Sequence, residues 1–228
     1  MIMMEALKNI LAGNTKVKTT EQAEKEIAKL DTQEAELQSQ LSQAQGEHSK
    51  VSNALEIISA SLIIDEKDKQ ALATKKKAEA KLEELAKQMA GLSPKIAEVS
   101  SKKQHAVQEL YRSRGEVGRK HNQKAYRDMV ITSRFNRAFN IESDPHKLNA
   151  IIPKGIDLAV EYGLGEIKDL NPSSEDWKFI VKLGKEDMEE GNSQADVIAK
   201  ELAKAIKGVF EKHNVELQKQ SLINLSRI

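Results

Sequence analysis

Ten cationic side chains lie between residues 102 and 137, with only three acidic ones among them. Six of the ten are arginines, whose guanidinium groups can bind phosphate oxygens in a bidentate manner. Tyr111, Tyr126, Phe135 and Phe139 are interleaved with them and could stack on bases, so this basic band could bind nucleic acid. Alternatively, the rings pack in a domain core and the cations pair with carboxylates of the chain or of a partner, the commoner role of a charge run. The cations are Lys102, Lys103, Arg112, Arg114, Arg119, Lys120, Lys124, Arg127, Arg134 and Arg137.

Outside the basic band, the sequence shows no spacing of residues that is typical of a catalytic or metal-binding site. No two of the five histidines are three or four residues apart, so no metal-binding pair on one helix face is expected. The chain has no cysteine, which excludes thiol chemistry and cysteine-based metal sites. We therefore predict no catalytic residue, no metal and no cofactor, and a protein that is not an enzyme.

Three short segments resemble ligand-binding motifs only in part. Residues 162–166 contain two glycines but lack the third glycine of a dinucleotide loop. Gly184 and Lys185 resemble the end of a Walker motif but lack its first glycine and its Ser or Thr. Both are interpreted as helix ends. The acidic residues 186–190 lack the spacing of a calcium loop. They are interpreted as a solvated helix face that ends at Gly191.

The composition indicates long amphipathic helices. Only 4% of residues are aromatic and four are proline, while 31% are charged, which favours an all-α protein over a β-sandwich. The net charge of +1 divides unevenly, with −2 over residues 1–101, +7 over residues 102–137 and −4 over residues 138–228. No apolar run is long enough to span a membrane. The absence of cysteine fits a reducing compartment, so we expect a cytoplasmic location or incorporation into a larger intracellular or viral particle.

The first long helix is predicted to begin at Thr19 or Thr20, where a capping residue precedes carboxylates. Apolar residues over 27–62 then alternate at spacings of three and four, which is typical of a coiled coil. Glu34 and His48 interrupt the apolar core positions. His48 could act as a pH switch, but a polar core residue that sets the helix register is the favoured interpretation.

The charged segment 65–69 interrupts the apolar stripe, which resumes over residues 72–110 in an arm of similar length. Pairing residue i with about 133 − i aligns the core positions of the two arms, which favours an antiparallel helical hairpin over one rod. A parallel homodimer is the rival arrangement. Ser93 and Pro94 resemble a helix start, so a break or kink is predicted at 91–94. The predicted core residues are Ile27, Leu30, Leu37, Leu41, Val51, Leu55, Ile58, Leu62, Leu72, Leu82, Met89, Leu92, Ile96, Val99 and Leu110.

We predict three parts in the chain. Residues 1–18 form a short amphipathic helix, which lacks the basic region of a signal peptide and is expected to dock on the protein or on a partner. Residues 19–115 form the coiled-coil hairpin. Residues 116–228 form a small helical domain.

Two functional hypotheses follow, and both concern binding. The first is a non-enzymatic interaction or assembly protein, such as a scaffold, an adaptor, a virion component or a protein inhibitor, that binds another protein of unknown identity and self-associates. The second is a nucleic-acid-binding protein that uses the basic band.

Overall fold

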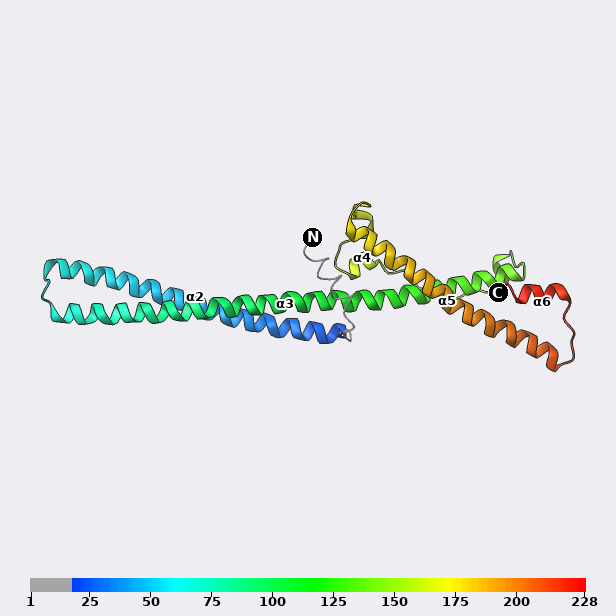
Figure 1. Ribbon diagram of the computed structural model, residues 1–228, viewed down its shortest axis with the longest axis horizontal. Coiled ribbons are helices and arrows are strands. Elements are labelled where there is room, and N and C mark those ends of the chain that lie inside the picture. Colours follow the sequence, from blue (N-terminus) through cyan, green and yellow to red (C-terminus); the bar gives the residue numbers. More distant parts are fainter. Residues whose placement is uncertain (1–17) are drawn as a thin grey trace. The chain divides into compact units, whose positions relative to one another are not determined.

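The computed structural model describes residues 18–228 and consists of helices joined by short connections (Figure 1). Two long helices come first, α2 (Thr20–Ile64) and α3 (Lys69–Ala138). No strand occurs within the described residues, and α2 packs against α3, so the predicted all-α fold with a helical hairpin followed by smaller helices is confirmed. The remaining elements are η1 (Asp144–His146), α4 (Leu158–Glu161), η2 (Ile167–Asp169), α5 (Glu175–Lys212) and α6 (Lys219–Leu225).

The described residues form two compact units, the hairpin unit (Lys18–Leu110) and the C-terminal unit (Tyr111–Ile228). The boundary falls inside α3, which runs without interruption from the hairpin unit into the C-terminal unit. The helix continues because residues 111–125 contain no proline and are rich in Arg, Glu, Lys and Gln, which favour helix. The predicted helix of residues 1–18 falls almost wholly outside the described residues. None of the helices between residues 18 and 228 is long and apolar enough to cross a membrane.

Side-chain caps define the ends of the hairpin. Thr19 and Gln22 form a capping box that starts α2, with the Gln22 backbone N–H donating to Thr19 Oγ1 at 3.2 Å. At the turn, Asp65 Oδ1 accepts from the Lys67 backbone N–H at 3.1 Å. Asp68 Oδ1 accepts from the backbone N–H groups of Gln70 and Ala71, which caps α3. The charged interruption in the stripe is therefore the turn itself.

The seam between α2 and α3 follows the predicted stripe with one local correction. All the predicted core residues are buried or half-buried except Leu72, which is 47% exposed. Leu85 is the most deeply buried large residue of the hairpin unit, at 1% exposed, and it is not among the predicted core residues. The spacing of three and four from Leu82 runs through Leu85 to Met89. Leu85 is therefore a core position of the second arm that the prediction missed.

Lys103 identifies the register of the two arms. It lies at a core position, and its Nζ contacts Asp31 Oδ1 at 2.6 Å and Glu34 Oε2 at 3.0 Å. These carboxylates raise the pKa of Lys103 through hydrogen bonds, first from Asp31 and then from Glu34. The predicted pairing places Lys103 opposite Leu30, about one helical turn from Glu34. Glu34, which interrupts the apolar stripe of the first arm, thus pairs with Lys103 across the seam.

The predicted break at residues 91–94 is absent, because α3 remains helical through Pro94. Ser93 does not cap a new helix. Its hydroxyl donates back to the Met89 carbonyl at 3.3 Å, which is a bond made within a continuing helix. Leu92 is only 6% exposed in the seam, so packing on this side outweighs the hydrogen bond that Pro94 cannot donate.

Helix α5 is also longer than predicted, because it runs through both Gly184 and Gly191. The interpretation of these glycines as helix ends was wrong. A Cβ at Gly191 would lie 2.9 Å from Cδ1 of Tyr126 and 3.0 Å from the Gln123 carbonyl oxygen. Gly191 therefore allows α5 to cross α3 closely, as the crossing in Figure 1 illustrates. By contrast, the predicted helix end near Gly163 is present, with α4 ending at Glu161 and Gly163 at φ +73°.

Two asparagines of α3 hold the irregular segment that follows it. Asn122 exchanges two hydrogen bonds with the backbone of Ile156, at 2.9 and 2.8 Å. Asn136 does the same with the backbone of Leu148, at 2.9 and 2.8 Å. Each amide side chain satisfies both backbone groups of a residue outside regular structure, so α3 positions this loop along its length.

Candidate interaction site

Most of the basic band lies beside carboxylates of the same chain. Six of the ten cations form ion pairs, and a seventh, Arg112, is buried at 5% exposed. The pairing also changes the carboxylates: the hydrogen bond from Lys102 to Glu98 and the attraction of its charge lower the pKa of Glu98. The pairs are Lys102 with Glu98, Lys103 with Asp31 and Glu34, Arg114 with Glu161, Arg119 with Glu116, Glu186 and Asp187, Arg127 with Asp128, and Arg134 with Asp196.

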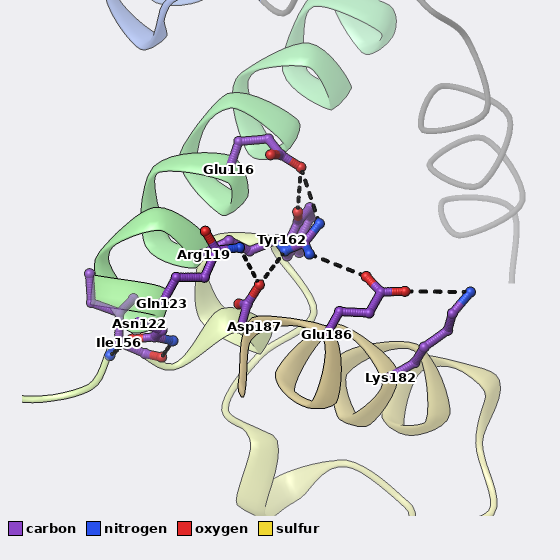
Figure 2. Close-up of polar contacts among 9 residues, drawn as sticks. All are labelled: Glu116, Arg119, Asn122, Gln123, Ile156, Tyr162, Lys182, Glu186 and Asp187. Atoms are coloured by element: carbon purple, nitrogen blue, oxygen red, sulfur yellow. Dashed lines mark hydrogen bonds and ion pairs between the residues drawn. The ribbon is translucent and has the colours of Figure 1, made fainter. Parts of the chain in front are cut away.

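Arg119 is the centre of the most extensive of these networks (Figure 2). Its Nε donates to Asp187 Oδ1 at 2.9 Å and its Nη2 donates to Glu186 Oε2 at 3.2 Å. Gln123 Nε2 donates to the same Asp187 oxygen at 2.8 Å. Asp187 is only 3% exposed, so the interpretation of residues 186–190 as a solvated face is wrong for this residue.

The Arg119 guanidinium keeps its positive charge because the attraction of Asp187 outweighs the effect of burial. Burial alone lowers the pKa of the Arg119 guanidinium, but hydrogen bonding and charge attraction from Asp187, with a smaller attraction from Glu116, leave that pKa raised. Asp187 Oδ2 has no hydrogen-bond donor among the described residues. The pair is therefore a buried structural link between α3 and α5 and is not available to an external phosphate.

Tyr162 is buried beside the Arg119 network and contacts Glu116, one of its members. Its ring is fully buried at 0% exposed, lies edge-on to Phe179 with the centroids 5.5 Å apart, and its hydroxyl donates to Glu116 at 3.3 Å. Burial and then the negative charge of Glu116 raise the pKa of the phenol, although the charge of Arg119 opposes this. The neutral phenol is therefore the form that the folded protein favours.

This burial predicts an alkaline limit to stability. Above about pH 10 an unfolded tyrosine loses its proton while the folded Tyr162 keeps it, so the free energy of unfolding should fall as pH rises, by up to about 1.4 kcal/mol per pH unit. Tyr162→Phe should abolish this part of the slope. Denaturant unfolding of both proteins between about pH 9 and 11 measures it. Identical slopes in wild type and variant would contradict the prediction.

The aromatic rings of the basic band also face inward. The Tyr111 ring lies against Gly163, the Tyr126 ring against Gly191, and Phe135 stacks on Phe139 with the ring centroids 4.8 Å apart. The two phenylalanines belong to a hydrophobic cluster with Ala138, Ala199, Leu225 and Ile228. These rings therefore pack in the interior of the C-terminal unit.

Three cations of the band are left outside these networks. Lys120, Lys124 and Arg137 are exposed, and the side chain of none of them makes an ion pair or hydrogen bond with another residue between 18 and 228. Arg137 lines a hollow. The structure thus reduces a ten-residue band to a few free side chains, which sequence reasoning could not separate from the paired ones.

Within the hairpin unit, the exposed large apolar residues lie near the turn between α2 and α3. Ile57, Ile63 and Ile64 are 72%, 82% and 90% exposed, and we call these three residues the tip patch. Ile57 and Ile64 are two helical turns apart and so share a face of α2. Leu72, at the start of α3, is exposed near the same turn. The sequence signal was present, since none of the three isoleucines belongs to the coiled-coil stripe.

No group of three or more potential metal ligands comes together in the part of the chain that the structure describes. Comparisons with protein-family models, curated proteins and solved structures gave no match.

Proposed function

We propose that this chain is a non-enzymatic interaction or assembly protein that binds another protein, and a second copy of itself, through the tip patch of its hairpin. The observation that carries the proposal is the exposure of the tip patch, where three large aliphatic side chains are 72% to 90% accessible within eight residues. Exposed apolar clusters of this kind mark interaction surfaces in soluble proteins. The hairpin then serves as the arm that carries this contact surface.

The charges at the tip favour a protein partner over a lipid surface. The turn between α2 and α3 carries Asp65, Glu66, Lys67 and Asp68, and Lys69 follows at the start of α3, which gives three acidic and two basic side chains. Anionic lipids attract basic segments, and this turn is not basic. A mixed-charge rim around an apolar patch is the usual composition of a protein interface. As part of the same proposal, the lack of cysteine favours a reducing compartment such as the cytoplasm.

Support for the nucleic-acid alternative is weaker. Six cations of the basic band already have carboxylate partners and the interleaved rings pack internally. At most of the band a phosphate would therefore have to displace existing ion pairs, and the interleaved rings are partly buried against other residues, which limits stacking on a base.

The test is a tip variant carrying Ile63→Ser and Ile64→Ser together. Both side chains are exposed in the free protein, so stability should change by less than about 0.5 kcal/mol each. Losing buried isoleucines from an interface should weaken association by about tenfold or more. Sedimentation velocity measures self-association, and affinity purification from the native host followed by quantification of each recovered protein measures partner binding.

A matched control is Val197→Ser on α5, which also removes an exposed aliphatic side chain, 56% exposed, but from the C-terminal unit. The proposal predicts that the control keeps both kinds of association. If the tip variant associates with itself and with partners as well as the wild type does, the tip patch is not the contact surface and the proposal fails.

A further inference from the structure

A hollow of about 300 Å³ in the C-terminal unit gathers cationic side chains from three separate segments of the chain. Arg134 and Arg137 come from α3, Lys200 comes from α5, and Arg227 follows α6. Asp196 is the only acidic residue among its described lining residues. Four cationic side chains therefore line this hollow together with one acidic side chain, although the net charge of residues 138–228 is −4.

The single carboxylate is already occupied. Arg134 Nη1 donates to Asp196 Oδ1, and Nη2 of the same arginine donates to Asn192 Oδ1 at 3.4 Å. The hydrogen bond from Arg134 lowers the pKa of Asp196, and the positive charge of Lys200 adds to the effect. Asp196 therefore pairs with Arg134 and attracts Lys200 more weakly, and it makes no ion pair with Arg137 or Arg227 among the described residues.

Arg137, Lys200 and Arg227 have no such partner. No ion pair or hydrogen bond joins the side chain of any of them to another residue of the described chain, in contrast to Arg114, which pairs with Glu161. Like charges that face one hollow repel one another, and an anion placed between them would relieve that repulsion. Arg137 and Lys200 come from helices that contribute to the hydrophobic cluster, and Arg227 lies between Leu225 and Ile228 of the same cluster.

The floor of the hollow is apolar and buried. Ala199, Leu225 and Ile228 line it and are 8%, 6% and 5% exposed, and all three belong to the hydrophobic cluster around Phe135 and Phe139. An apolar floor lowers the local dielectric constant and strengthens the attraction between the cations and an anion above it. It also keeps α3, α5 and the residues after α6 at a constant spacing.

We propose that this hollow binds a compact multivalent oxyanion, the phosphate group of a small molecule, through Arg137, Lys200 and Arg227. Guanidinium groups bind phosphate oxygens in bidentate fashion, and an ammonium group adds a point charge. A volume of about 300 Å³ is at the small end of ligand sites, which suits a phosphate group with a small body. This site is independent of the tip patch, which belongs to the hairpin unit.

The experiment is a calorimetric titration of the full chain with pyrophosphate at low ionic strength. Wild type should show saturable binding at a single site. Arg137→Gln and Lys200→Gln should each weaken it by about tenfold, because each removes a charge-assisted contact, and Arg227→Gln gives a third, independent variant. The matched control is Lys207→Gln, which removes one charge from the same helix α5 outside the hollow, where Lys207 pairs with Glu211. It should bind within about twofold of wild type.

Circular dichroism and the fluorescence of Trp177 verify that each variant is folded. Absence of saturable pyrophosphate binding in wild type would overturn the proposal, as would equal weakening by Lys200→Gln and Lys207→Gln, which would indicate only diffuse charge. A short single-stranded oligonucleotide is added as competitor. Failure to displace pyrophosphate supports a small-molecule phosphate, whereas displacement at equal phosphate concentration would overturn that assignment in favour of nucleic acid.

Discussion

Replacing Gly115 with alanine is expected to destabilise the C-terminal unit by about 3 kcal/mol or more. A Cβ at this position would lie 2.2 to 2.4 Å from three atoms of the Tyr162 ring, a separation that real Cβ atoms do not adopt. The ring is 0% exposed and is enclosed by Leu158, Ile180 and Leu183, so it cannot move aside without disturbing the core. The strain far exceeds the roughly 1 kcal/mol that alanine gains over glycine inside a helix.

Denaturant unfolding followed by the fluorescence of Trp177 measures this effect, because Trp177 is the single tryptophan and lies in the C-terminal unit. Gly184→Ala is the matched control, since Gly184 is also inside a helix of this unit but its added Cβ meets nothing within 4 Å. It should stabilise the unit by about 0.5 to 1 kcal/mol. Similar effects of the two substitutions would show that Tyr162 does not pack on Gly115 as described.

Replacing Arg119 with methionine is expected to cost about 3 to 5 kcal/mol, because it leaves the Asp187 carboxylate buried without its cation. Asp187 is 3% exposed and would keep only the hydrogen bond from Gln123, at 2.8 Å. The methionine fills much of the space of the arginine stem, so the loss measures the uncompensated charge more than a cavity. Thermal and denaturant unfolding of the variant test the prediction.

A second substitution separates charge from packing. Adding Asp187→Leu to Arg119→Met removes both charges, and the double variant should recover most of the lost stability, as buried ion pairs often tolerate apolar replacement. Lys182→Met is the control, because Lys182 lies 3.8 Å from Glu186 at the exposed edge of the same network and its side chain is 75% exposed. It should change stability by less than about 0.5 kcal/mol. A comparable loss in Lys182→Met and Arg119→Met would contradict the assigned role of the buried pair.

Sequence patterns predicted the structure correctly where it depends on residues close together in the chain. The stripe from Ile27 to Leu62, its turn at residues 65–68 and the Thr19 cap are properties of neighbouring residues, and the sequence predicts them directly. The stop signals were less reliable. Pro94, Gly184 and Gly191 all lie inside continuous helices, because packing of the surrounding residues outweighs the local preference at these positions.

For the basic band, the sequence by itself determined the excess of positive charge but not which cations are paired. Composition and spacing established an all-α chain, a coiled-coil hairpin and an excess of positive charge over residues 102–137. Which cations are neutralised depends on carboxylates up to 72 positions away in the chain, such as Asp31 beside Lys103 and Asp187 beside Arg119. Only the tertiary structure brings these groups together, because Coulomb attraction depends on distance in space and on burial, and neither can be read from separation along the sequence. For the same reason, only the fold brings Arg137, Lys200 and Arg227 together around one hollow, where their positive charges lack ion-pair partners within the described chain.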